Sequence, residues 1–220
     1  MDKSILDNFI PWKSADFYTF SGNDTVTTYF PSGVSSQEIS PESQSPDSFN
    51  YIAEIPIATA KSMEGKYFVG TAVNVRFGEA TNGWARLYNP PGSGVNLYVN
   101  AWVISDIIST PFRIQIWFNS TPPGIIQESP FVVSGNTAII PRPQPKTILQ
   151  FGVGVRGFPT DGNLAFGRSG AAGTMIEEEE QGRFIFPPGG SFTVYLSNPE
   201  RPTLPAIARV AFGWWEEPIL

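Results

Sequence analysis

Strict alternation of side-chain character, interrupted by proline and glycine turns, is the feature that most constrains the fold of this chain. From Tyr67 to Phe77 the odd positions are apolar or β-branched, whereas the even positions are mostly small or polar. The same period of two recurs in 95–103 and in 112–118. Because successive side chains of a strand point to opposite faces, this period predicts half-buried β-strands.

Turn clusters separate these stretches, among them N-P-P-G-S-G, N-S-T-P-P-G, P-T-D-G-N and F-P-P-G-G. Proline fixes φ, and glycine or asparagine accepts the positive φ that tight turns require. Further strands are expected at 84–88, 131–133, 137–140, 147–155, 183–186, 191–196 and 206–215. No segment has a helical period with caps. Many short strands at close spacing predict an all-β fold, an antiparallel β-sandwich of jelly-roll type.

The N-terminal quarter differs from the rest, so we divide the chain into an acidic Ser/Pro-rich arm over 1–60 and a β-sandwich domain over 61–220. The arm holds eight acidic and two basic residues, whereas the domain holds twelve of each. Such a composition is typical of a disordered tail. Its apolar islands instead suggest an arm that docks on its own domain or on a neighbouring subunit. The candidate anchors are Phe9, Trp12, Phe17, Tyr18 and Phe20.

The chain contains no cysteine and no histidine. This composition excludes disulfides, thiolate nucleophiles, cysteine-based metal sites and histidine-based triads. Any catalysis would have to rest on carboxylates, Lys, Tyr or an oxygen-ligated metal. A plausible set of such residues is not apparent, so we expect no enzyme, with no catalytic residue, cofactor or metal ligand. An acidic arm lacks the basic footprint that nucleic acid requires. Neither a signal peptide nor an apolar run long enough to span a membrane is apparent, so no membrane insertion is expected.

Two motifs suggest chemistry but have plainer explanations. Gly152, Gly154 and Gly157 match a dinucleotide-binding pattern, yet a turn follows where that pattern needs a helix. We interpret them as a strand whose glycine face lets a backbone or a large ring approach closely. The four acids of 177–180 could ligate calcium, but neighbouring side chains of an extended chain point to opposite sides and do not converge. We therefore expect a solvated acidic turn.

The best candidate interaction surface is an outward-facing aromatic row. On the alternation of 95–103, Asn96, Tyr98, Asn100 and Trp102 face away from the core, with Trp117 beside them on a second strand. Aromatic rings among amides suit a protein interface or docking of the arm, and they also suit sugar stacking. The row therefore leaves both a protein partner and a carbohydrate open.

The C-terminal stretch G-W-W-E-E-P looks at first like a sugar-processing site. Adjacent strand residues face opposite sides, however, so Trp214 separates from Trp215 and Glu216 from Glu217. A glycosidase needs two carboxyl groups that face each other across one bond. We therefore predict a closing strand, with one tryptophan in the core and Trp215 available to the arm or to a neighbouring subunit.

Three stretches carry a resemblance to a known family: Y-F-V-G-T-A-V-N-V-R-F-G, N-G-W-A-R-L-Y-N-P-P-G-S-G-V-N-L-Y-V-N and V-A-F-G-W-W-E-E-P. Over 66–217 the chain resembles an uncharacterised family, a domain of unknown function, of small all-β proteins from spore-forming Gram-positive bacteria. The resemblance implies a location at the spore or the cell surface and transfers no functional residue. By analogy, jelly-roll subunits with extended N-terminal arms build spore appendages, although those commonly use cysteine cross-links, which this chain lacks.

These observations predict a non-enzymatic structural subunit that self-assembles into a ring or fibre through its N-terminal arm. The alternative is a lectin-like, carbohydrate-binding module built on Tyr98, Trp102 and Trp117. The candidate interface residues are thus the five arm aromatics together with Tyr98, Trp102, Trp117 and Trp215.

Overall fold

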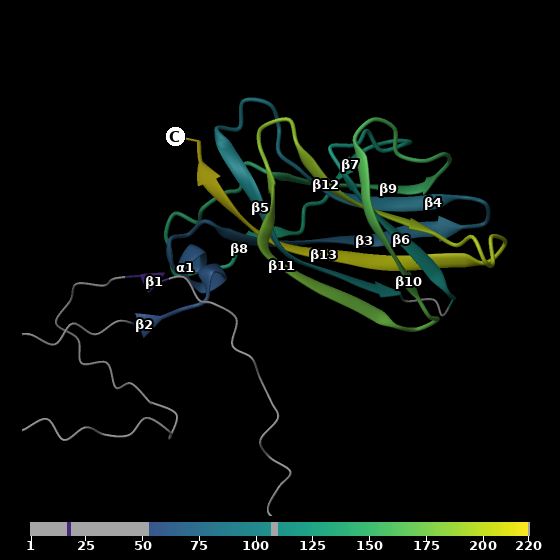
Figure 1. Cartoon of the computed structure of the whole chain (residues 1–220), viewed down its shortest axis with the longest axis horizontal. Coiled ribbons are helices and arrows are strands. Elements are labelled where there is room, and N and C mark those ends of the chain that lie inside the picture. The colour runs from purple at the N-terminus through teal and green to yellow at the C-terminus, as the bar shows by residue number, and fades with distance from the viewer. Residues whose placement is uncertain (1–16, 19–52, 107–109, 220) are drawn as a thin grey trace, which may run out of the picture. The chain divides into compact units, whose positions relative to one another are not determined.

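The computed structural model describes residues 17–18, 53–106 and 110–219, which fall into two compact units, Met1–Ile57 and Ala58–Leu220 (Figure 1). In the first unit, β1 (Phe17–Tyr18) pairs antiparallel with β2 (Ala53–Glu54). The second unit holds nearly all of the short helix α1 (Ile57–Met63) and two antiparallel sheets. No described helix has the length and apolar character that crossing a bilayer requires.

The two sheets of the second unit pack face to face as a sandwich. The five-stranded sheet has the order β11 (Met175–Phe186), β5 (Val95–Asp106), β13 (Pro205–Pro218), β3 (Tyr67–Gly78) and β8 (Val132–Ser134). The six-stranded sheet has the order β10 (Asn163–Gly170), β6 (Phe112–Phe118), β12 (Ser191–Ser197), β4 (Asn82–Tyr88), β9 (Ile148–Val155) and β7 (Gln127–Glu128).

The strand pairing confirms the predicted jelly roll. The first long strand of the domain, β3, pairs with the last, β13. The second pairs with the second to last, and so on, which gives the pairs β4 with β12, β5 with β11 and β6 with β10. A long antiparallel ribbon rolled into two sheets gives this nested pairing. Along β3 to β6, and again along β10 to β13, successive strands consequently lie in different sheets, and the apolar faces of both sheets are buried against each other.

An excursion between β6 and β10 adds three strands to this plan. After Phe118 the chain crosses to the far edge of the sandwich, where β9 and β7 extend the six-stranded sheet beside β4. Between them, β8 extends the five-stranded sheet beside β3 through the pairs from Phe68 with Ser134 to Gly70 with Val132. The excursion therefore covers part of an edge that would otherwise stay unpaired.

Buried apolar side chains from both sheets fill the space between them. On β6 the predicted alternation is confirmed, since Phe112, Ile114 and Ile116 are buried and Phe118 packs against the same core. A second small cluster lies on the other face of the six-stranded sheet, formed by Trp84, Val155, Tyr195 and the partly buried Trp117. Gly152 confirms the expected approach of a large ring, because a Cβ there would lie 2.4 Å from the Trp84 indole nitrogen.

β-Bulges reverse the predicted faces of two strands. In β3 the register shifts around Asn74, whose φ is 58°, so Tyr67 and Val69 face outward whereas Val75 faces the core. In β5 the shift falls at Asn100, because Val99 pairs with Trp214 but Ala101 pairs with Gly213. One extra residue moves every later side chain to the opposite face.

Two local predictions were wrong, and one short helix was not predicted. Residues 137–140 form turns rather than a strand. The seven-residue α1 is too short to show a helical period, so the sequence pattern did not indicate it. The acidic run 177–180 lies within β11 and is not a solvated turn. Its second member, Glu178, forms an ion pair with Arg168 at 3.2 Å, and Glu180 is buried.

Candidate functional site

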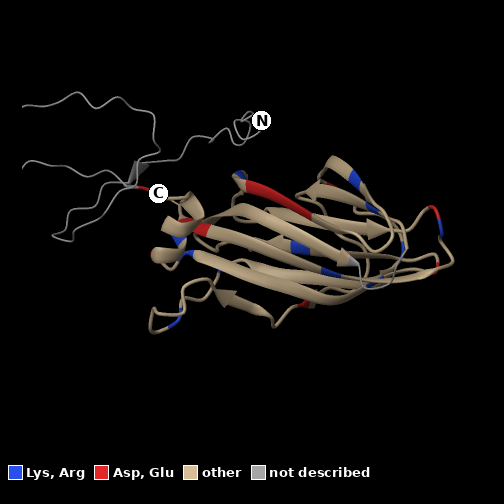
Figure 2. Ribbon diagram, turned by 90° about the horizontal axis from the view of Figure 1, so that it is seen from below, with Lys and Arg blue, Asp and Glu red and all other residues tan. Residues whose placement is uncertain are grey.

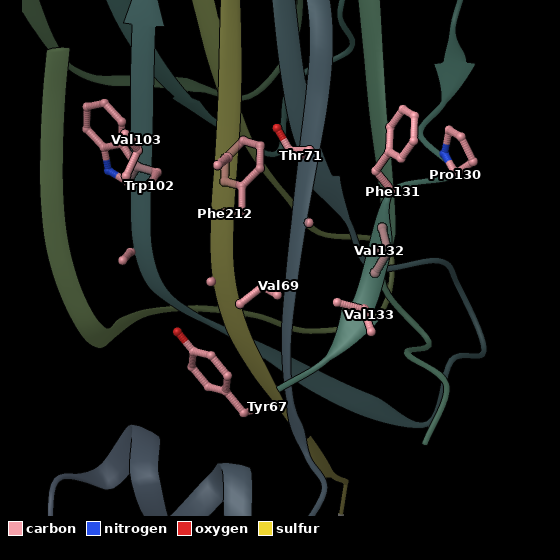
Figure 3. Close-up of a pocket in the computed structure, with 14 residues that line it drawn as sticks. Tyr67, Val69, Thr71, Trp102, Val103, Pro130, Phe131, Val132, Val133 and Phe212 are labelled. Carbon is pink, nitrogen blue, oxygen red and sulfur yellow. The ribbon is translucent and has the colours of Figure 1, made fainter. Parts of the chain in front are cut away.

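An apolar groove lies on the outer face of the five-stranded sheet. It has a volume of about 650 Å³. Its lining comes from β3, β5, β13, β8 and the residues just before β8, as Figure 3 shows. Hence segments that are far apart in the sequence build one continuous surface.

Small side chains give the groove its depth. Ala101 on β5 and Ala211 and Gly213 on β13 all face outward over the central strands. The wall on the β8 side carries Phe131 and Val133, which are 55% and 41% exposed. The small residues of β5 and β13 form the floor of the groove, and the larger side chains of Phe131 and Val133 form its wall. The space between them can hold an inserted side chain.

Tyr67 closes one end of the groove. Its hydroxyl accepts a hydrogen bond of 3.0 Å from the Asn100 side-chain amide, and it lies so close to Gly213 that a Cβ there would be 2.3 Å from the oxygen. Burial raises the pKa of Tyr67 above its ordinary value, against the opposite effect of the Asn100 hydrogen bond. The hydroxyl therefore stays protonated at neutral pH and serves to position the ring.

Charged side chains lie outside the groove. Figure 2 shows few Lys, Arg, Asp or Glu residues along the strands, apart from the acidic run of β11. Glu177 and Glu179 are exposed on the outer face of β11, the strand at one edge of this sheet. In the strand register they lie opposite Val103 and Ala101 of β5. Exposed Arg209 lies two residues before the floor residue Ala211 on β13, and exposed Arg76 lies on the neighbouring strand β3, so both mark the other end of the groove. The groove is thus an apolar strip with an acidic side and a basic end.

The lining has few polar groups, and its hydroxyl groups already form hydrogen bonds. The Thr71 hydroxyl donates to the Val210 carbonyl at 3.4 Å, the Tyr67 hydroxyl accepts from Asn100, and the remaining lining groups are almost entirely apolar. Within 53–106 and 110–219, no three carboxylate, imidazole or thiolate side chains are grouped so that they could share a metal ion. The arrangement suits the burial of an apolar ligand or chain segment.

The predicted aromatic row does not form. Trp102 is fully buried in the core, so its expected outward orientation was wrong, and the bulge at Asn100 is the reason. Its indole N–H donates to the buried Glu180 carboxylate at 3.2 Å. Tyr98 does face outward but belongs to the five-stranded sheet, whereas Trp117 belongs to the six-stranded sheet. The structure therefore does not bring these three rings together.

Trp215 is covered by its own domain, so the prediction that it would be available to a partner was wrong. It is 4% exposed and stacks on Tyr98 with ring centroids 5.4 Å apart. Gly182 in the bulge of β11 packs against the six-membered ring of the Trp215 indole, and a Cβ at this position would clash with that ring. The predicted separation of the two tryptophans is confirmed, because Trp214 lies in the core between the sheets.

The two carboxylates of G-W-W-E-E-P fasten the end of the chain. The buried Glu216 side chain accepts hydrogen bonds from the backbone N–H groups of Lys146 and Thr147, at 2.8–3.0 Å, and from the Trp214 indole at 3.3 Å. Glu217 forms ion pairs with Lys61 at 2.6 Å and Lys66 at 2.9 Å. Both acids hold segments of the fold together.

Among the arm candidates, Phe9, Trp12 and Phe20 lie outside the described residues. Phe17 and Tyr18 form β1, and the structure describes their backbone only. Sequence reasoning did not find the groove residues Phe131, Val133, Ala101 and Ala211. The apolar run 130–133 next to a turn was the one available signal, but it also fits an ordinary buried strand.

Comparison with known proteins gives one match. No curated protein and no solved structure matches the chain. A family model described as a family of unknown function, DUF6143, matches residues 43–220. The chain therefore belongs to this family, whose matched region includes the whole sandwich and begins upstream of β2.

Proposed function

We propose that this DUF6143 protein is a non-enzymatic structural subunit that self-assembles into a ring or fibre, the N-terminal arm of one copy lying in the groove of the next. The observation that carries the proposal is the apolar groove of about 650 Å³ on the five-stranded sheet. A large exposed apolar surface on a protein in water commonly marks a binding site. Repeated head-to-tail contacts close into a ring or extend into a fibre.

The arm has the chemistry of the expected occupant. It carries five candidate aromatic anchors, Phe9, Trp12, Phe17, Tyr18 and Phe20, which can fill the hollow over the small floor residues. With β1 paired to β2, the 16 residues before Phe17 span about 55 Å when extended, enough to reach another copy.

Charge favours the same occupant. The arm is acidic, and the exposed Arg76 and Arg209 mark one end of the grooved face. Glu177 and Glu179 on the β11 side would repel it, which favours a path along the β8 side beside Phe131 and Val133. Electrostatic complementarity of this kind selects orientation more than it adds affinity.

A position at the spore or cell surface is part of the proposal and is supported by the family resemblance alone. It is tested by immunogold labelling of sporulating cells of the source bacterium. Label over the spore coat or the cell envelope supports this location, and label confined to the cytoplasm of every cell would overturn it without affecting the assembly proposal.

The test of assembly is the particle mass of the full chain in solution, measured by light scattering. We expect a mass several times the 24.1 kDa of one chain. Replacing the five arm aromatics with serine, or combining Phe131→Asp with Val133→Lys, is expected to return the mass to that of one chain. A matched control combines Ile125→Asp with Ile126→Lys, at side chains that are 81% and 46% exposed and do not line the groove, and should leave the assembly intact. A wild-type chain of monomeric mass sinks the proposal.

A further inference from the structure

We propose that a second surface, a trough on the outer face of the six-stranded sheet, binds an acidic sugar chain such as an oligomer of a hexuronic acid. The trough consists of two adjacent hollows of about 240 and 230 Å³ that share Arg113 and Gln115 on β6. Together they fall in the range of roughly 300–1,000 Å³ typical of small-molecule sites. This surface is separate from the apolar groove, and the inference does not rest on self-assembly.

Phe158 provides a fixed aromatic platform at one side of the trough. Its side chain is 62% exposed although its loop is well anchored, since Tyr195 and Asn82 both donate hydrogen bonds to the Gly157 carbonyl. Phe158 also packs on the Tyr195 ring, with centroids 5.8 Å apart. An exposed ring that the protein holds in place can stack on a sugar at little entropic cost.

Polar side chains on the floor of the trough supply the hydrogen bonds. The side-chain carbonyl of Gln115 accepts a hydrogen bond of 3.4 Å from the Trp117 indole N–H. The side-chain amide N–H groups of Gln115 can then donate to a ligand. Asn82 uses its amide nitrogen on the Gly157 carbonyl at 3.3 Å, and its oxygen remains an acceptor. Donors and acceptors beside an aromatic ring fit the mixed faces of a sugar.

The charge of the trough selects an acidic sugar. Neither hollow is lined by an Asp or Glu residue, whereas Arg113 lines both. Arg168 at the far margin is already paired with Glu178 at 3.2 Å, so Arg113 is the cation to which we assign the ligand. A guanidinium binds a carboxylate through two parallel hydrogen bonds, a geometry that a neutral sugar cannot offer.

The test is isothermal titration calorimetry of the full chain with tri-galacturonate, with cellotriose as the neutral comparison. We expect tri-galacturonate to bind at least ten-fold more tightly than cellotriose. Arg113→Gln should remove that preference, and Phe158→Ala should weaken binding of the acidic sugar at least five-fold. Arg142→Gln, which changes the same charge at an exposed loop position outside the trough, should bind as the wild type does.

The outcomes separate cleanly. Absence of measurable heat with tri-galacturonate overturns the proposal, and so does equal binding of the two sugars. Equal loss of binding in the Arg113 and Arg142 variants would also overturn it, because that result reports nonspecific attraction to positive charge. The particle mass of the Arg113 variant should stay that of the wild type, so a failure of self-assembly and a failure of sugar binding are distinguishable.

Discussion

Gly182 shows how a single residue decides which surface of this protein stays closed. Its φ is 74°, and the Trp215 ring occupies the space where a side chain would start. The glycine therefore lets the bulge of β11 cover a tryptophan that alternation alone left open to a partner. At the residue scale, the positions of the β-bulges decide which side chains are exposed to a partner, as much as the side chains themselves do.

We predict that Gly182→Ala lowers the free energy of unfolding by about 2–4 kcal/mol. The left-handed backbone conformation at this position disfavours alanine, and the added methyl group would clash with Trp215. The control is Gly189→Ala, which has a φ of 88° but no atom within 4 Å of the new methyl group. It should cost only about 1 kcal/mol. Urea unfolding followed by tryptophan fluorescence measures both, and equal costs would show that Trp215 is not packed as described.

Glu216 gives a second prediction at this scale. Replacing it with glutamine should lower the free energy of unfolding by about 2 kcal/mol, since three N–H donors lose a charged acceptor in a buried site. Glu177→Gln removes the same charge from an exposed position and should change stability by less than about 0.5 kcal/mol. Urea unfolding compares the two variants. Unchanged stability of the Glu216 variant would contradict the fastening role of G-W-W-E-E-P.

At the scale of elements, a cluster of four charges joins α1 and the residues after it to the end of β13. Lys61 and Lys66 each contact both Glu64 and Glu217, at 2.6–3.2 Å. Partial burial alone would raise the pKa of Glu64, but hydrogen bonds from Lys66 and Lys61 hold it below its ordinary value. Hydrogen bonds that Lys66 donates to Glu64 and Glu217 raise the pKa of Lys66.

This cluster sets a pH window for its contribution to stability. Because the pKa of Glu64 is lowered on folding, its contribution is complete above the ordinary value of about 4.3 and is lost as pH falls through the folded value. Because the pKa of Lys66 is raised on folding, the stabilisation by Lys66 is complete below the ordinary lysine value of about 10.4. It is lost as pH rises through the folded value. We predict that Glu64→Gln costs about 0.5–1 kcal/mol between these limits and nothing at pH 2. Urea unfolding at pH 2, 4 and 7 measures the difference, and a cost that persists at pH 2 would contradict the ion-pair account.

How far the elements could be predicted depends on local regularity. β6 alternates without interruption, so its buried and exposed faces were predicted correctly. β3 and β5 carry bulges at Asn74 and Asn100, and their outer faces, which form the groove, were therefore assigned to the wrong side. A bulge depends on pairing with a distant strand, and no local pattern encodes it. The groove could not be predicted for the same reason, since Phe131 reaches it only through the excursion after β6.

At the scale of the whole molecule, the turn clusters and strand lengths were sufficient to predict a jelly roll. This fold serves binding and assembly in many unrelated proteins, so the fold alone does not assign a function. Assembly is proposed because the domain carries an exposed apolar groove and the sequence of the arm suits it. In this proposal the arm of one chain contacts Phe131 of another.

Site-specific photo-cross-linking tests that contact most directly. Phe131 lies on the exposed wall of the groove, so Phe131→p-benzoylphenylalanine keeps an aromatic side chain there and is expected not to disturb the fold. Chains labelled with ¹⁵N and unlabelled chains are co-assembled in equal amounts, irradiated, digested and analysed by mass spectrometry. We predict cross-links from position 131 to peptides within 1–52 that join a labelled to an unlabelled chain. Cross-links confined to peptides of 58–220, or joining the arm only to its own chain, would contradict assembly through the arm.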